Sequence, residues 1–433
     1  LGCYGAPTLR TPHLDRLAAG GLRFDRAFCT APQCSPSRAS LFTGRYPHAN
    51  GVMGLTHAEF AWDLYPDERH IGQILHEHGY RTAMLGIHHE SRAEEHEKVA
   101  VRCGMDEMVP PMHGEDLTNE AIARLERFAR DDQSFYLQIG YHEPHRATRD
   151  GDAYPDWMGY TGDYIEPDTD RGVAIPGWLL DESGARDELA ELQGAIRYVD
   201  TAIGRLLDAI DELGLRDNTL VVMTTDHGLA LPRAKCTLYD PGIQTALIMR
   251  LPPRGWVGGQ VVSNLVSNVD IFPTILELLD LPISDRVQGR SLISLIEGDP
   301  ASVRDAIFAE LTYHDYYDPQ RAIRTERHKL IVYFTIAPSF MDPSQSWRPR
   351  TRPIRPENPA TDYHVPIALY DLDSDPLELE NRADDPVYAD IRRDLLCRLS
   401  EWLHATNDPI LQGAITSPTH HEALAHLDGD ASG

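Results

Sequence analysis

The chain has 433 residues, of which 42% are hydrophobic, and its 40 Lys and Arg residues face 67 Asp and Glu residues for a formal net charge of −27. It is long enough to bury a large core, its charge disfavours nucleic acid and anionic membranes as partners, and no stretch reaches the roughly 18 to 20 apolar residues that span a bilayer. An anionic substrate must therefore be held by a local cluster of cations. The six cysteines are too sparse and irregular for a disulfide scaffold or for paired zinc ligands.

The first element of chemical interest is a short helix predicted over residues 36–43. Ser35 can cap its start, Pro36 suits its first turn, and Gly44 ends it. Cys34 then lies at the positive end of the helix, and Arg38, one turn further on, can reach back over it. Such a pair could lower a thiol pKa and hold an oxyanion such as sulfate or phosphate. A small structural cysteine near a helix start is the equally weighted alternative.

Short apolar runs alternate with helical patterns up to about residue 280. Between them, apolar residues at gaps of three and four predict a long amphipathic helix over residues 189–213. The predicted strands are Thr82–Gly86, Phe135–Gly140, Leu220–Thr225 and Ala246–Met249. This alternation predicts an α/β fold whose mainly parallel central sheet is covered by helices on both faces, and residues 1–300 are predicted to form that domain.

The texture of the sequence changes after Asp299-Pro300. Residues 301–433 are predicted to form a smaller antiparallel α+β subdomain. It would contain strands at Ala306–Leu311 and Lys329–Phe334, a Pro- and Arg-rich loop over 343–366, and a terminal helix near 391–404. The tail from Thr416 onward is expected to be frayed.

Three loops after predicted strands carry histidine, and ligands gather beyond the carboxyl ends of parallel strands. The loops contain His88-His89, His142 and Asp226-His227. The carboxylate of Asp226 and the imidazole of His227 can both face a divalent cation, although many such turns are only hydrogen-bonded loops. Lys235 could add a cation to an anion site. An ordinary cysteine protease would not need this set, because it uses one base and one orienting group.

With these residues, the chain resembles a type I sulfatase of the alkaline phosphatase superfamily. Cys34-Ser35-Pro36-Ser37-Arg38 with Thr43-Gly44 matches the Cys-x-Pro-x-Arg motif of that family, and the resemblance covers nearly the whole chain. Within the family, the sequence is most similar to the heparan N-sulfatases, or sulfamidases. The segments that carry this similarity are CSPSRAS, HEPHR, the spacing from Asp-His-Gly to LYDPG, and EWLHATNDP.

The resemblance implies that a formylglycine-generating enzyme oxidises Cys34 to Cα-formylglycine. One oxygen of the hydrated aldehyde, bound to Ca²⁺ together with Asp226 and His227, would attack sulfur, and the other hydroxyl would later expel sulfate. The remaining roles implied by the resemblance are sulfate stabilisation by Arg38, base catalysis by His89, sulfate binding and leaving-group assistance by His142 and Lys235, and substrate recognition by His314.

Two departures from the family pattern bear on these roles. The family holds its metal with a further Asp pair after its first strand, which would lie upstream of Leu1, so we expect residues to be missing there. The usual Gly-Lys-x-His is Gly86-Ile87-His88-His89 here. Either His88 supplies the cation of the missing lysine to the substrate, or the sulfate pocket is weaker or differently shaped.

Three hypotheses for function follow. The first is hydrolysis of a sulfate ester or sulfamate on a sugar, with N-sulfoglucosamine as one candidate. The second is a phosphonate monoester or phosphodiester hydrolase with the same site, because an oxyanion pocket alone does not separate sulfur from phosphorus. The third is a binding protein that kept the fold and lost catalysis.

The expected partners are a sulfated saccharide and the maturation enzyme, with a homodimer as the candidate assembly and with no nucleic acid or membrane. We expect a soluble protein of unassigned compartment, in a family that is often periplasmic, secreted or lysosomal.

Overall fold

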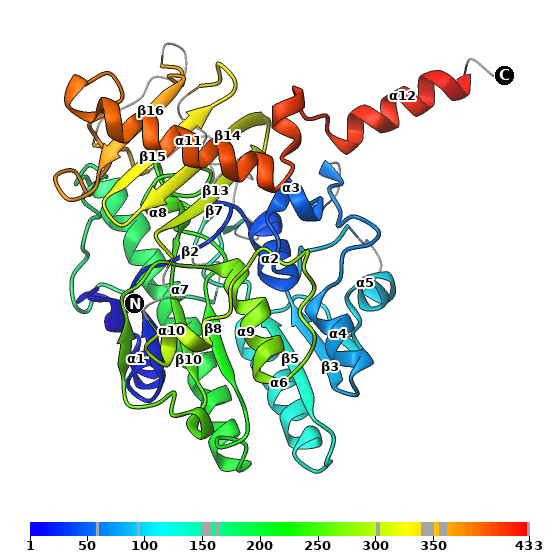
Figure 1. The fold of residues 1–433 in the computed structure, drawn as a ribbon. Coiled ribbons are helices and arrows are strands. Elements are labelled where there is room, and N and C mark those ends of the chain that lie inside the picture. Colours follow the sequence, from blue (N-terminus) through cyan, green and yellow to red (C-terminus); the bar gives the residue numbers. More distant parts are fainter. Residues whose placement is uncertain are drawn as a thin grey trace.

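The computed structural model describes residues 1–57, 60–92, 96–148, 158–160, 164–299, 304–338, 350–354 and 362–430 (Figure 1). Its first sheet contains β3 (Arg81–Gly86) at the centre, paired in parallel with β4 (Glu107–Val109) and β5 (Phe135–Gly140). β3 and β5 are the strands predicted at Thr82–Gly86 and Phe135–Gly140. Their observed bounds differ from the predicted ones by at most one residue.

Helices cover both faces of this sheet because successive residues of a strand point to opposite sides. Ala83 and Leu85 pack on α6 (Gly114–Phe128), and the intervening Met84 packs on α5 (His96–Cys103). The long helix α7 (Ser183–Glu212) lies beside α6, as the periodicity predicted, but it begins six residues earlier than expected. The predicted α/β fold with a parallel sheet between helices is confirmed.

A second, mixed sheet contains β8 (Val221–Thr224) at one edge. Its strand order is β11-β1-β10-β8, and β10 (Leu247–Arg250) is antiparallel to both of its neighbours. Ile248 faces α1 and α7, whereas Leu247 and Met249 face the opposite side. The remaining elements of this part of the chain are α1 (Pro12–Ala19), β1 (Leu22–Phe24), β2 (Ala27–Phe28), α2 (Cys34–Thr43), α3 (Pro47–Asn50), α4 (Ile71–Glu77), β6 (Ala147–Thr148), β7 (Met158–Gly159), α8 (Asp240–Ile243), β9 (Gln244–Thr245), β11 (Gln260–Val262), β12 (Val266–Ser267), α9 (Ile271–Leu278) and α10 (Ile293–Ile296).

A large cavity adjoins β5 and β8, each of which pairs on one side only among the described strands. Residues 131–145 and 218–230 line it without interruption, and apolar side chains of α7 and α9 also line it. Its volume is about 2070 Å³. The four residues of β8 are only half-buried, although their neighbours in β10 are fully buried. The cavity is therefore a slot along the edges of β5 and β8 that pair with no other described strand.

The C-terminal region forms the predicted antiparallel sheet, seen in yellow and orange in Figure 1. Helix α11 (Ala389–Ala405) packs against it. The order of the sheet follows the chain through β13 (Ala306–Tyr313), β14 (Tyr317–Thr325), β15 (His328–Tyr333) and β16 (Ile367–Asp371). The proposed boundary at residue 300 and much of the predicted loop over 343–366 lie outside the described residues.

The C-terminal tail was expected to be frayed, and that expectation is wrong for most of its length. Pro418–Asp430 forms α12, which projects away from the rest of the molecule (Figure 1). Pro418 suits the first turn of a helix, and the following residues contain no helix breaker until Gly429. Among all the helices described, none is both long and apolar enough to cross a membrane.

Candidate active site

Cys34 is the first residue of α2, and Gln33 takes the N-cap position in extended conformation. The prediction that Ser35 caps the helix is therefore wrong: its Oγ accepts a hydrogen bond from the backbone N of Thr56 at 3.2 Å. The helix ends at Gly44, whose φ of 68° favours glycine, as expected. As the first residue of the helix, Cys34 lies at its positive end. The residue is 9% exposed and lines the wall of the cavity.

Two nitrogens surround the Cys34 sulfur. Nε2 of His227 lies 3.3 Å from Sγ, and Nζ of the buried Lys235 lies 3.6 Å from it. Burial by itself would raise the pKa of the Cys34 thiol, but the charges of Lys235 and His227 outweigh it and lower that pKa well below its ordinary value. The surroundings of the Cys34 sulfur therefore favour a negatively charged group at that position.

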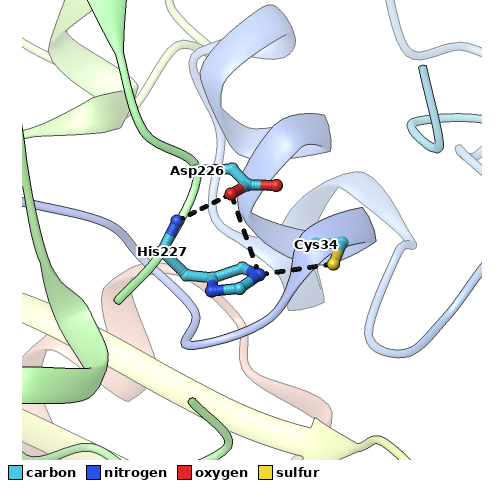
Figure 2. Close-up of side chains that lie close together, drawn as sticks. All are labelled: Cys34, Asp226 and His227. Carbon is cyan, nitrogen blue, oxygen red and sulfur yellow. Dashed lines mark hydrogen bonds and ion pairs between the residues drawn. The ribbon is translucent and has the colours of Figure 1, made fainter. Parts of the chain in front are cut away.

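Asp226 and His227 follow β8 and turn toward Cys34 (Figure 2). Nδ1 of His227 lies 2.8 Å from the Gly228 carbonyl, which can only accept, so the ring nitrogen donates there. This leaves Nε2, 3.7 Å from Oδ1 of Asp226, as the ring nitrogen that would coordinate a cation once the ring has lost its second proton. The potential ligand atoms of Cys34, Asp226 and His227 all lie within 4.8 Å of one another, close enough to share one cation.

The Arg38 side chain lies between the loop that follows β3 and the loop that follows β8. Its Nη2 donates to the carbonyl of Ile87 at 2.7 Å, and its Nε donates to the carbonyl of His88. Nη1 is 3.9 Å from Oδ2 of Asp226. Gly140 makes this approach possible, because a Cβ there would lie 1.9 Å from the Ile87 carbonyl oxygen and 3.1 Å from Arg38.

His89 and His142 line the same cavity from the loops that follow β3 and β5. His89 has a φ of 59°, which is uncommon for a residue with a side chain and marks a constrained turn after β3. His142 lies beside His145, with ring centroids 5.3 Å apart. Burial, and secondarily the neighbouring His145, lower the pKa of His142, so its ring favours the neutral form.

The cavity brings together most of the residues that the sequence singled out. Its lining includes Cys34, Arg38, His89, His142, Asp226, His227 and Lys235, together with Ile87. It includes neither His88 nor His314. His88 turns toward the rings of His89 and His96, and burial lowers its pKa, which argues against His88 as a replacement cation. His314 is buried beside Asp315, with 3.2 Å between Nδ1 and Oδ2.

Three further residues contribute to the site but were assigned no role from the sequence. His145 lines the cavity and helps to lower the pKa of Cys34. Glu90 and Gln138 lie behind Arg38 and bond to each other, with 2.6 Å between Gln138 Nε2 and Glu90 Oε1. The signal for His145 was its place in the His-Glu-Pro-His loop, whereas Glu90 had no signal beyond its position after His89.

Comparisons with known proteins agree with this geometry. Residues 1–281 match the family model described as Sulfatase, and residues 229–341 match the one described as N-sulphoglucosamine sulphohydrolase, C-terminal. Human N-sulphoglucosamine sulphohydrolase is 28% identical over 94% of this chain and 88% of its own length. The chain therefore shares both of its sequence regions with that relative.

Two solved structures share the fold at lower identity. One, a complex with its substrate D-glucosamine-2-N,6-O-disulfate, is 20% identical with a TM-score of 0.66, covering 94% of this chain and 95% of the other. A phosphonate monoester hydrolase from Silicibacter pomeroyi is 22% identical with a TM-score of 0.67, covering 93% and 92%. The shared fold thus accommodates both sulfur and phosphorus chemistry.

Proposed function

The chain belongs to the sulfatase family, and from this premise we propose that it hydrolyses a sulfate ester or sulfamate on a sugar, with N-sulfoglucosamine as the first candidate substrate. Membership makes the chain a sulfuric ester hydrolase. The observation that carries the proposal is the convergence of Cys34, Arg38 and Lys235 with Asp226 and His227 on one cavity. This set combines a nucleophile position, two fixed cations and two metal ligands, which suit a tetrahedral oxyanion.

We assign the side chains as follows. Arg38 and Lys235 would neutralise the sulfate oxygens, because both are fixed cations within reach of the Cys34 position. His142 and Lys235 would bind the sulfate and assist the departure of the amine or alcohol. His89 would accept the proton whose loss releases sulfate. Conversion of Cys34 to Cα-formylglycine would supply a hydrated aldehyde, which can attack sulfur and afterwards expel sulfate without a second hydrolysis of an ordinary ester.

The metal ligands fit a divalent cation in part. The family implies a metal ion, and we propose that it is Ca²⁺, which would act as a Lewis acid at the sulfate. Asp226 offers oxygen, the preferred ligand atom of Ca²⁺, whereas His227 offers the softer imidazole nitrogen. Ca²⁺ usually takes about six to eight oxygen ligands, so this set needs further carboxylates.

The slot adjoining β5 and β8 is where we propose that those carboxylates enter. Apolar side chains line both faces of the slot, and the site residues lie at its end, after Gly140 and Thr224. A strand in the slot would end beside Asp226, because β5 and β8 both end there. Leu1, Tyr4 and Leu9 line the same cavity, which favours a segment preceding Leu1 as the source of the strand.

The second candidate function is phosphonate or phosphodiester hydrolysis, which the fold shared with a phosphonate monoester hydrolase favours. A substrate panel tests the two functions. The formylglycine form is incubated with 4-nitrophenyl sulfate, N-sulfoglucosamine and 4-nitrophenyl phenylphosphonate, and kcat/KM is compared. The proposal predicts the highest kcat/KM on a sulfated substrate. Preference for the phosphonate would transfer the assignment to the second function, and turnover of none would favour the non-catalytic binding protein.

The remaining proposals concern partners. A sulfated saccharide is the partner that the sulfatase relatives support. A formylglycine-generating enzyme would act on Cys34 during maturation, and a homodimer remains the proposed assembly. Ile87 at the cavity wall, in place of a lysine, predicts a sulfate pocket that binds more weakly or has a different shape.

A further inference from the structure

Glu90 is a fully buried carboxylate that none of the assigned catalytic roles uses. It follows His89 and lies against three different elements. Its Oε1 accepts from Nε2 of Gln138 on β5 at 2.6 Å, and its Oε2 is 3.4 Å from Nε of Arg38 on α2. Burying a carboxylate costs free energy unless it is paired and hydrogen-bonded. Gln138 and Arg38 supply these partners to Glu90.

His70 completes the surroundings of Glu90 from the start of α4. Nδ1 of His70 accepts the backbone N–H of Gly72 at 3.0 Å, so the neutral ring carries its proton on Nε2. That nitrogen lies 3.7 Å from Oε1 of Glu90. Burial would raise the pKa of Glu90, but Arg38, together with His70, outweighs burial and lowers it to about 2. The carboxylate is therefore charged at neutral pH.

We propose that Glu90 is a positioning residue for Arg38, holding the Nε side of the guanidinium so that its Nη1 side faces the cavity and the sulfate that we propose binds there. The guanidinium has two carboxylates within 4.0 Å, Glu90 at its Nε and Asp226 at its Nη1. A charged Glu90 balances the attraction of Asp226. Without it, Arg38 would pair more closely with Asp226 and turn away from its bonds to the carbonyls of Ile87 and His88.

This inference rests on the proposed sulfatase function for its kinetic readout, and a double-mutant cycle tests it. In the formylglycine form, E90Q should lower kcat/KM about 10- to 100-fold, and E90D should recover part of that loss. In an R38A background, E90Q should have no further effect on kcat/KM, because its target is gone. An equal loss in both backgrounds would show that Glu90 acts independently of Arg38 and would overturn the proposal.

A matched control separates positioning from stability. Glu68 is buried, 3.0 Å from Arg45 and 2.6 Å from Arg286, and does not line the cavity. E68Q should leave kcat/KM within about twofold of wild type. If E68Q lowers kcat/KM as strongly as E90Q, loss of a buried carboxylate is sufficient explanation, and the positioning role fails.

The structure of the E90Q variant decides the proposal without turnover. Crystals of E90Q should show the Arg38 guanidinium detached from the Ile87 and His88 carbonyls and closer to Asp226. A guanidinium unchanged from the wild-type position would overturn the inference even if the enzyme is a sulfatase. Failure of the wild-type protein to hydrolyse any sulfated substrate would instead refute the proposed function, and the crystals would still judge Glu90.

Discussion

At the scale of single residues, Lys235 shows how burial and charge combine at the site. Its side chain is 4% exposed, yet its Nζ lies 3.6 Å from the Cys34 sulfur. Burial would lower the pKa of Lys235, but Cys34 outweighs that effect and raises it. A fixed ammonium in a site sheltered from water stabilises negative charge more strongly than one in solution.

Replacing this lysine should therefore affect catalysis far more than folding. We expect K235A to lower kcat/KM on an aryl sulfate about 100- to 1,000-fold, because the developing charge loses a preorganised cation. The exposed Lys98 on α5 provides the matched control, and K98A should retain kcat/KM within about twofold. Steady-state kinetics of both variants checks the prediction, and similar activity of K235A and wild type would remove Lys235 from the site.

Individual residues also show where inference from sequence reached its limit. The identities of Cys34, Arg38, Asp226, His227 and Lys235 were sufficient to predict that they converge, and all of them line one cavity. Adjacent histidines could not be separated in this way. His89 enters the cavity because its backbone adopts a φ of 59°, a conformation that the sequence Ile-His-His-Glu does not announce.

At the scale of elements, a buried ionic cluster ties α3, β13 and β14 to the segment after α11. Arg321 pairs with Asp408 at 2.5 Å, and Glu310 lies 3.3 Å from Arg321 and 2.9 Å from His48. All four side chains are buried. Burial would raise the pKa of Asp408, but Arg321 outweighs it and lowers that pKa below its ordinary value. The charged form of Asp408 therefore stabilises the junction.

Removing the Asp408 charge should destabilise this junction at neutral pH. We expect D408N to lower the free energy of unfolding by about 3–5 kcal/mol at pH 7, because Arg321 keeps a buried charge without its partner. A depressed carboxyl pKa gives stability above its ordinary value near 4 that is lost as the pH falls. The difference between D408N and wild type should therefore shrink below pH about 4.

Urea unfolding at several pH values measures this effect. Asp305 pairs with Arg398 at 2.9 Å, but its side chain is 88% exposed, so D305N should cost less than about 1 kcal/mol. A D408N penalty that equals that of D305N, or that does not change with pH, would contradict the role assigned to the cluster.

The prediction of whole elements depended on how strongly their patterns were expressed. The 30-residue α7 was predictable because its apolar positions repeat over many turns. The start of α2 was misplaced by two residues, because Ser35 and Gln33 can both precede a helix and only tertiary contacts, here with Thr56, decide between them. β14 was missed because its polar side chains are buried in ion pairs, which hides the usual alternation.

At the scale of the whole molecule, the two sequence regions share one hydrophobic core. Tyr46, Val52 and Trp62 from the first region pack in the same cluster as Ile323 and Trp402 from the second. The parts of the chain before and after the proposed boundary at residue 300 therefore support each other's folding. The sequence pattern predicted the parallel and the antiparallel sheet, but it could not predict that side chains from both regions pack in one hydrophobic cluster.

The slot adjoining β5 and β8 leads to a prediction about the metal. Extending the chain before Leu1 with an apolar strand that ends in two aspartates should raise both the melting temperature and the affinity for Ca²⁺, because such a strand would bury apolar surface and place carboxylates beside Asp226. Calorimetric titration of the extended and present chains with Ca²⁺ measures the difference. D226N should abolish the gain in the extended chain. Equal affinities of the two chains, or an upstream sequence without acidic residues, would refute the proposed strand.

The central claim is that Cys34 is converted to formylglycine and that this residue performs the hydrolysis. The most direct test is the mass of the Cys34 peptide from protein produced with and without a formylglycine-generating enzyme, measured beside sulfate release by the same samples. We predict that activity rises in proportion to the aldehyde fraction and is absent when Cys34 remains a thiol. Full turnover by protein whose Cys34 is an intact thiol would contradict the account.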